Sequence, residues 1–187
     1  MKTAIFGGTF DPIHRAHLIV AREAADRFAL DRVLFIPAAN PPHKDAGAGY
    51  EDRYKMVELA CGGEPRFVPS RLEEGRGKNY SIHTIERVKA QPDSGQVFFV
   101  IGSDAFADIR SWHRWEDVVR EIDFIVVSRP GHAFSIPPGA RVHRLETVAL
   151  PVSSSETRQA LARGETPEEL PPAVAAYIRE HGLYKVW

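Results

Sequence analysis

Short runs of apolar residues alternate along the chain with longer segments in which apolar residues recur every three or four positions. The short runs predict buried strands at residues 4–6, 33–36, 66–68, 97–101 and 124–127, with a weaker strand at 141–145. The longer segments predict amphipathic helices at about 14–29, 54–61, 81–88, 115–122, 153–161 and 174–182. Ser81 and Ser153 are expected to cap the helices that follow them, and Glu156 stands at capping-box spacing from Ser153.

This alternation of strands and helices predicts an α/β protein with a parallel sheet covered by helices on both faces. No internal repeat or linker interrupts the pattern, so we expect a single domain over residues 1–187, with a helical part at about 153–187 packed on it. Ligands of such sheets gather at the carboxyl ends of the strands. The polar stretch at 73–79 is a candidate lid over that edge.

Charge and composition argue against several classes of protein. The chain has 24 basic and 25 acidic residues, so its bulk charge does not favour nucleic acid as a partner. No run approaches the roughly 20 apolar residues of a membrane span, and the N-terminal residues lack the apolar region of a secretory signal. The lone cysteine, Cys61, cannot form an intrachain disulfide and is expected to be buried. We therefore expect a cytoplasmic protein without a membrane partner, and the sequence leaves open whether it forms a homo-oligomer.

The segment from Gly7 to His17 joins the first predicted strand to the first predicted helix. Its two leading glycines allow a tight turn, and the helix N-terminus that follows offers N–H groups and a partial positive charge to a phosphate. His14 and His17 lie three residues apart, so both face one side of the first turn and can donate hydrogen bonds to phosphate oxygens. Two other interpretations stay open here: a plain turn with surface histidines, and a metal site, although no Cys or third His lies close by.

The same segment, Gly-Gly-Thr-Phe-Asp-Pro-Ile-His-Arg-Ala-His, resembles the GGTFDPxHxGH signature of the nucleotidyltransferase superfamily. A second element, Val152 to Arg158, resembles the ISSTxxR element of that superfamily. The resemblance implies a Rossmann-like fold of the nucleotidyltransferase type, with His14, His17 and Arg158 as catalytic residues. It implies an ATP site formed by Gly7, Gly8, Thr9, Phe10, His14, His17, Ser153, Ser154 and Arg158. Mg²⁺ is expected to arrive bound to the ATP phosphates, with no metal ligand set in the protein.

Further segments resemble bacterial nicotinate-nucleotide adenylyltransferases, in the order found in that family. They are residues 41–44, 80–84, 101–104, 112–113, 128–131 and 177–184. The resemblance implies that Gly102 and Asp104 lie at the adenosine of ATP. It also implies a site for nicotinate mononucleotide: Lys44 on its phosphate, Thr84 and its neighbours on its carboxylate, Trp112 stacked on its pyridine ring, and Arg129 as a further contact. The implied reaction forms nicotinate adenine dinucleotide and pyrophosphate.

Alternatives to this interpretation remain at the sequence level. Taken alone, Lys44 is a solvated loop lysine, Trp112 a core aromatic and Asp104 a helix cap. The signature also departs from the family at Ala16, where glycine is usual, and at Thr157, where an apolar residue is usual. Four competing functions follow: adenylyl transfer to phosphopantetheine, adenylyl transfer to nicotinamide mononucleotide, a tRNA synthetase fragment, and a nucleotide sensor without activity.

Overall fold

The computed structural model describes residues 1–40, 46–75, 77–148 and 152–185, and in these residues six strands form one sheet. The strands are β1 (Lys2–Gly8), β2 (Arg32–Pro37), β3 (Phe67–Pro69), β4 (Gln96–Gly102), β5 (Asp123–Ser128) and β6 (Arg141–Glu146). They lie in the order β3-β2-β1-β4-β5-β6, and every neighbouring pair is parallel. The strand order reverses between β1 and β4, which is where ligands bind in sheets of this kind. The predicted parallel sheet is confirmed, including its weaker sixth strand.

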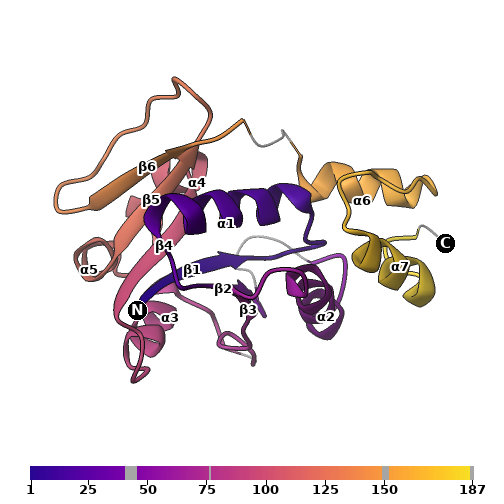
Figure 1. Ribbon diagram of the computed structural model, residues 1–187, viewed down its shortest axis with the longest axis horizontal. Helices are drawn as coiled ribbons and strands as arrows, with labels where there is room; N and C mark the ends of the chain where they lie inside the picture. Colours follow the sequence, from indigo (N-terminus) through magenta and orange to yellow (C-terminus); the bar gives the residue numbers. More distant parts are fainter. Residues whose placement is uncertain (41–45, 76, 149–151, 186–187) are drawn as a thin grey trace.

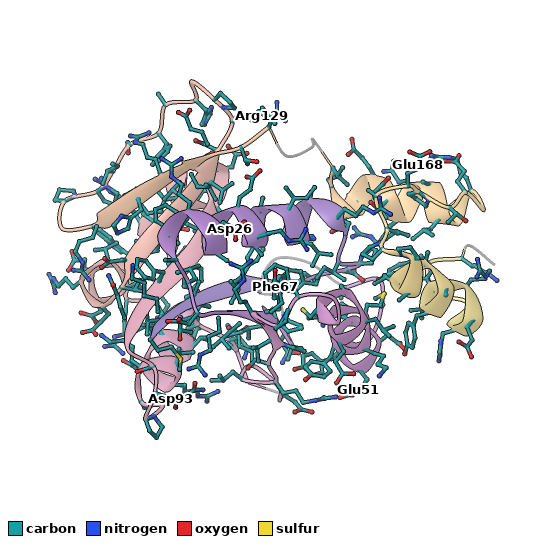
Figure 2. The ribbon with its side chains drawn as sticks, viewed as in Figure 1. Asp26, Glu51, Phe67, Asp93, Arg129 and Glu168 are labelled. Atoms are coloured by element: carbon teal, nitrogen blue, oxygen red, sulfur yellow. The ribbon has the colours of Figure 1, made fainter. Side chains whose placement is uncertain are left out.

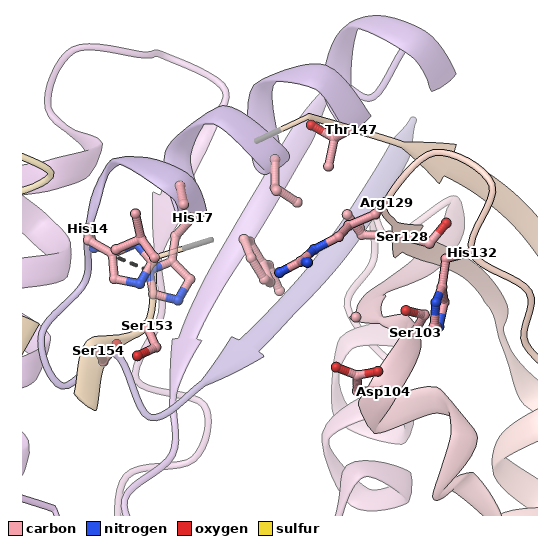
Figure 3. A pocket seen from close by; sticks show the side chains of 16 residues that line it. His14, His17, Ser103, Asp104, Ser128, Arg129, His132, Thr147, Ser153 and Ser154 are labelled. Carbon is pink, nitrogen blue, oxygen red and sulfur yellow. Dashed lines mark hydrogen bonds between the residues drawn. The ribbon is translucent and has the colours of Figure 1, made fainter. Parts of the chain in front are cut away.

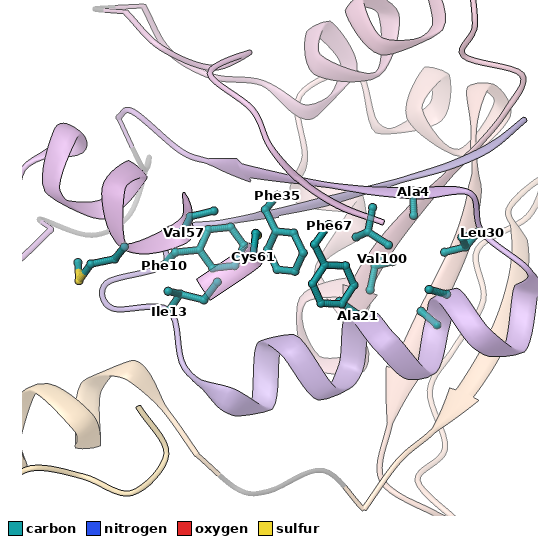
Figure 4. Packing of buried hydrophobic residues seen from close by; sticks show 14 of the residues in the cluster. Ala4, Phe10, Ile13, Ala21, Leu30, Phe35, Val57, Cys61, Phe67 and Val100 are labelled. Atoms are coloured by element: carbon teal, nitrogen blue, oxygen red, sulfur yellow. The ribbon is translucent and has the colours of Figure 1, made fainter. Parts of the chain in front are cut away.

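Helices cover both faces of this sheet, as predicted (Figure 1). They are α1 (Arg15–Phe28), α2 (Tyr50–Cys61), α3 (Ser81–Lys89), α4 (Ser103–Ala107), a 3₁₀ turn (Ile109–Ser111), α5 (Trp115–Glu121), α6 (Ser154–Ala162) and α7 (Pro172–His181). Successive strand residues point to opposite faces, so Ala4 joins the core under α1 and α2, whereas Ile5 joins the core under α3 and α5. Figure 4 shows the first of these cores, where Phe35, Phe67 and Val100 pack against Ala21 of α1.

The two C-terminal helices lie beyond the carboxyl end of β1 (Figure 1). Leu170, Val174 and Ile178 are each no more than 3 % exposed and belong to the same core as α1 and α2. Many charged side chains lie on the surface: Glu51 and Asp93 point away from the molecule in Figure 2. No helix in the described part of the chain is long and apolar enough to cross a membrane.

The helix ends confirm one capping prediction and overturn another. Ser153 caps α6. Its side chain accepts a hydrogen bond from the Glu156 N–H, and the Glu156 carboxylate accepts one from the Ser153 N–H. Ser81 does not cap α3, because that helix begins at Ser81 and Tyr80 is the N-cap. The Tyr80 ring stacks on His113 at 4.3 Å between centroids, and its carbonyl accepts from the His83 N–H. Tyr80, rather than Ser81, therefore occupies the position that precedes the helix.

Candidate active site

A pocket of about 590 Å³ opens at the carboxyl edge of the sheet, beside the point where the strand order reverses (Figure 3). Its walls come from β1, α1, the β4–α4 junction, the end of β5 and the start of α6. The lining residues are Phe6, His14, Ala16, His17, Val20, Gly102, Ser103, Asp104, Val127, Ser128, Arg129, His132, Thr147, Val152, Ser153 and Ser154. Two segments about 140 residues apart in sequence, the start of α1 and the start of α6, therefore share one pocket.

His14 and His17 stack on each other at the first turn of α1, with ring centroids 3.8 Å apart. The backbone N–H of His14 donates to Nδ1 of His17 at 3.2 Å (Figure 3). Since Nδ1 accepts, the ring proton of neutral His17 must lie on Nε2, which makes Nε2 a hydrogen-bond donor. The rings of Phe6 and Phe10 pack edge-on against His17 at 6.1 and 5.1 Å, which fixes its orientation.

Both histidines are neutral at physiological pH. Burial lowers the pKa of His14 to about 4, although the nearby Glu169 carboxylate opposes the shift. Burial and the neighbouring His14 together hold the pKa of His17 well below its ordinary value. Nδ1 of His14 is buried and has no hydrogen-bond partner among the described residues. The pair therefore offers neutral N–H donors, rather than positive charges, to a ligand.

The glycines at the start of the signature have separate roles. Gly8 ends β1, and a Cβ there would lie 3.2 Å from the Phe10 ring, which is itself 2 % exposed. Phe10 has φ +48°, so its side chain turns back into the core, and a contact of Phe10 with ATP would come from its backbone. Neither Gly7, Gly8 nor Thr9 is among the residues that line the pocket. The turn positions the histidines, which do line it.

At the start of α1, one of the backbone N–H groups is already hydrogen-bonded within the protein. The N–H of Arg15, the first residue of α1, donates to the Glu169 carbonyl at 2.7 Å. Thr157 helps to hold Glu169 beside the start of α1. Its buried hydroxyl lies 3.1 Å from the Glu169 carboxylate and 3.1 Å from the Ser153 carbonyl. The threonine that stands at position 157 in place of the family's apolar residue therefore has hydrogen-bond partners for its buried hydroxyl.

The other departure from the family, Ala16, is 8 % exposed and lines the pocket.

Arg158 reaches the signature loop but does not line the pocket. Its Nη1 donates to the Asp11 carbonyl at 2.8 Å and lies 3.7 Å from the Asp11 carboxylate. Ser154, one turn earlier, lines the pocket and donates its hydroxyl to the Pro12 carbonyl at 3.0 Å. The start of α6 is therefore attached to the signature loop by two side chains that the sequence had assigned to ATP.

Gly102, Asp104 and Arg129 form the opposite wall. Gly102 is the N-cap of α4 and has open space where a Cβ would stand, so a ligand can approach the backbone there. Asp104 lies in the first turn of α4 and is not its cap, contrary to the alternative interpretation. Arg129 follows β5, and its side chain points back across the pocket toward the histidines (Figure 3).

The residues predicted to bind the mononucleotide divide into three groups. Arg129 lines the pocket of the histidines, whereas Thr84 and Trp112 belong to the opposite face of the sheet. There the Trp112 ring packs on Phe99 at 5.7 Å, and the adjacent His113 stacks on Tyr80. Thr84 is 4 % exposed and donates its hydroxyl to Glu73 at 2.6 Å, so its side chain is engaged inside the protein. Lys44 lies outside the described residues.

The stretch at 73–79, predicted as a candidate lid, is attached to the rest of the protein at several points. The Glu73 side chain accepts from the Thr84 hydroxyl of α3, and within the stretch the Asn79 side chain donates to the Glu73 carbonyl at 3.0 Å. The Asn40 amide donates to the Gly75 carbonyl at 2.8 Å, which ties the stretch to the end of β2. Burial raises the pKa of Glu73, and its carboxylate is stabilised by the Thr84 hydroxyl.

Arg53 is a structural residue that the sequence interpretation missed. It is 1 % exposed and donates to the carbonyls of Thr9 and Ala38 at 2.8 Å and of Ala48 at 3.1 Å. It thereby joins the loops that follow β1 and β2. The helix was predicted from residue 54 but begins at Tyr50, and Arg53 lies four residues before Val57, on its apolar face.

Comparisons with known proteins show which family this chain resembles. Residues 5–160 match the cytidylyltransferase-like family model. A probable nicotinate-nucleotide adenylyltransferase of Solibacter usitatus is 60% identical over 98% of this chain and 100% of the relative. A second one, from Thermus thermophilus, is 39% identical over 99% of this chain and 100% of the relative.

Solved structures share the fold at lower identity. Nicotinic acid mononucleotide adenylyltransferase of Plasmodium falciparum, complexed with NaAD, superimposes with a TM-score of 0.83 at 22% identity, over 98% of this chain and 97% of that one. At this identity the likeness establishes the fold alone. The family model and the closely similar relatives carry the assignment further: the chain belongs to the cytidylyltransferase-like family and, within it, to the nicotinate-nucleotide adenylyltransferases.

Proposed function

We propose that the chain binds ATP in the pocket of Figure 3 and transfers its adenylyl group to nicotinate mononucleotide, releasing pyrophosphate. One observation carries this proposal: the histidine pair of α1 and the capped start of α6 face the same pocket, opposite Gly102 and Asp104. Two sets of phosphate donors beside an open backbone approach suit a nucleoside triphosphate. The family membership of the chain supports the same conclusion.

The proposed chemistry is an in-line attack. A phosphate oxygen of the mononucleotide attacks the α-phosphorus of ATP, the bond from that phosphorus to the bridging oxygen breaks, and pyrophosphate leaves. The attacking phosphate is already an anion, so the reaction needs no general base. The protein aligns two anions and stabilises the charge that develops on the phosphates. His17 Nε2–H is the donor best placed for this, because its tautomer is fixed by the bond from the His14 backbone.

In this proposal Arg158 and Arg129 each bind a phosphate group of the substrates. Arg158 holds the pyrophosphate as it departs, after exchanging part of its contact with Asp11 for the ligand. The position of Arg129 across the pocket from the histidines favours a contact with a phosphate at the junction of the two substrates. Because Arg forms paired hydrogen bonds with phosphate oxygens, either residue can orient the group it holds.

The acceptor site is proposed at Trp112 and the first turn of α3. The N–H groups at that turn, at Ser81 and Ile82, point out of the helix and suit a carboxylate. Thr84 contributes by fixing the Glu73 side chain, since its own hydroxyl is engaged there. An amide presents N–H donors to these N–H groups, so the acid is the expected substrate over nicotinamide mononucleotide. Lys44 stays assigned to the acceptor phosphate.

Mg²⁺ fits this site as an ion carried by the ATP phosphates. Among the described residues that line the pocket, Asp104 has the single carboxylate, and the other side-chain oxygen atoms belong to Ser and Thr hydroxyls. No group of three or more His, Cys, Asp or Glu side chains in the described part of the chain has the arrangement of a metal site. The ion would neutralise phosphate charge. We propose the cytoplasm as the compartment of the reaction, as the sequence predicts.

Pyrophosphate release with three acceptors tests the proposal. Nicotinate mononucleotide, nicotinamide mononucleotide and phosphopantetheine are each supplied with ATP and Mg²⁺, and the adenylylated product is identified by mass. We expect the acid to react with the highest kcat/KM. Faster reaction of phosphopantetheine would reassign the acceptor. Binding of ATP without release of its pyrophosphate in the presence of any of the three acceptors would make the chain a nucleotide sensor.

A further inference from the structure

Asp11, in the middle of the signature loop, is a buried junction for three distant segments. Asp11 is 3 % exposed, and its side chain accepts hydrogen bonds from the N–H of Gly47 at 2.6 Å and the N–H of Ala48 at 3.1 Å. The hydroxyl of Tyr184 donates to the same carboxylate at 2.7 Å. A single carboxylate thus joins the loop after β1, the start of the segment leading into α2, and the C-terminal end of the described chain.

The backbone of Tyr184 adopts an unfavourable conformation in this place. Its backbone lies in the left-handed region, with φ +63°, which is unfavourable for a residue other than glycine. Its ring also occupies the space beside Gly47, where a Cβ would come within 3.2 Å of it. Burial and the bond to Asp11 raise the pKa of Tyr184, so its hydroxyl remains a donor. The surrounding structure therefore specifies both the position and the protonation of this side chain.

The main chain beside this junction supports the phosphate site directly. The carbonyl of Asp11 accepts from Arg158, and the carbonyl of Pro12 accepts from Ser154 at the start of α6. His14 follows two residues later and opens α1. A shift of the Asp11 side chain would therefore move the donors of α1 and α6 relative to each other.

We propose that Tyr184 is a positioning residue for the ATP phosphate site, which acts by fixing the Asp11 carboxylate under the signature loop. The proposal rests on the adenylyl transfer proposed above. Its expected effect is on the chemical step, because small displacements of aligned groups reduce the rate of the step more than they reduce binding.

The experiment compares Tyr184→Phe with the matched control Tyr177→Phe in the full chain. Tyr177 lies on α7 and donates to the Asp52 carboxylate at 2.9 Å, so it makes the same kind of bond to α2, away from the signature loop. Each variant loses one hydroxyl, and both are expected to lower Tm by about 2–4 °C. Tyr184→Phe is expected to lower kcat about tenfold with less than about a threefold change in the KM for ATP, whereas Tyr177→Phe stays within about twofold of the wild type.

A second variant tests the route through Asp11. Asp11→Asn keeps the size of the side chain but changes the acceptor, and the double variant with Tyr184→Phe should lose less activity than the product of the two single losses. Equal kinetics of Tyr184→Phe and Tyr177→Phe would overturn the proposal, and so would independent losses in the double variant. Absence of turnover in the wild type would instead overturn the proposed function, so the two failures are distinguishable.

Discussion

At the scale of single residues, the fixed tautomer of His17 leads to a kinetic prediction. Because Nδ1 accepts from the His14 backbone, Nε2–H is available as a donor in the pocket. We expect His17→Ala to lower kcat by about 10²–10³-fold, the usual loss for one donor to a charge that develops in the transition state. Steady-state rates of pyrophosphate release measure it. His143→Ala, whose ring contacts Asp123 and does not line the pocket, serves as the control. Undiminished turnover in the first variant would remove His17 from the chemistry.

His14 also makes stability depend on pH. Burial lowers its pKa to about 4 from an ordinary value of 6.5, so the unfolded chain binds a proton more readily than the folded chain as the pH falls below 6.5. The loss of stability begins there and is complete below about pH 4, and at pH 5 it amounts to about 2 kcal/mol for this residue. Urea unfolding of the ligand-free protein at pH 8 and pH 5 measures it. His14→Gln is expected to lose less between these two pH values, and an equal loss would contradict the assignment.

At the scale of elements, the capped start of α6 makes a separate prediction. Ser153 completes a capping box with Glu156, whereas Ser155 is exposed in the first turn of the same helix. We expect Ser153→Ala to lower the free energy of unfolding by about 1 kcal/mol and Ser155→Ala to change it much less. Chemical denaturation of both variants tests this difference. Similar losses would show that the cap contributes little to the stability of this helix.

The elements also show which features the sequence could predict. Capping of α6 depends on residues three apart, and the strands depend on local apolar runs, so both were predictable. The N-cap of α3 was predicted wrongly, because Ser81 is a residue type typical of caps but is the first residue of the helix, and Tyr80 precedes it. The engagement of Thr84 by Glu73 and of Arg158 by Asp11 was not predictable either, because it depends on contacts between segments apart in sequence. The sequence therefore allowed us to predict which residues belong to the site, but not which residues they contact.

At the scale of the whole molecule, we infer that the C-terminal helices and the sheet form a single domain, because they share one apolar core. Ile178 of α7 is 3 % exposed and lies in the same cluster as Ala21 of α1 and Phe67 of β3. Ile178→Ala is expected to lower the free energy of unfolding by about 2–5 kcal/mol. If the core is shared, this loss must appear equally at the far side of the sheet, where Trp112 and Trp115 pack against the other core.

Two probes of unfolding distinguish a shared core from separate units. In a Trp187→Phe background the fluorescence comes from Trp112 and Trp115, and far-UV circular dichroism reports all the helices. Coincident transitions that move together in Ile178→Ala are expected of a single cooperative unit. If the transition followed by circular dichroism moves to lower stability in Ile178→Ala while the transition followed by fluorescence does not change, the chain consists of two units that unfold separately. Residues 153–187 would then be a separate module, and the positions of Ser154 and Arg158 at the signature loop would depend on how that module docks.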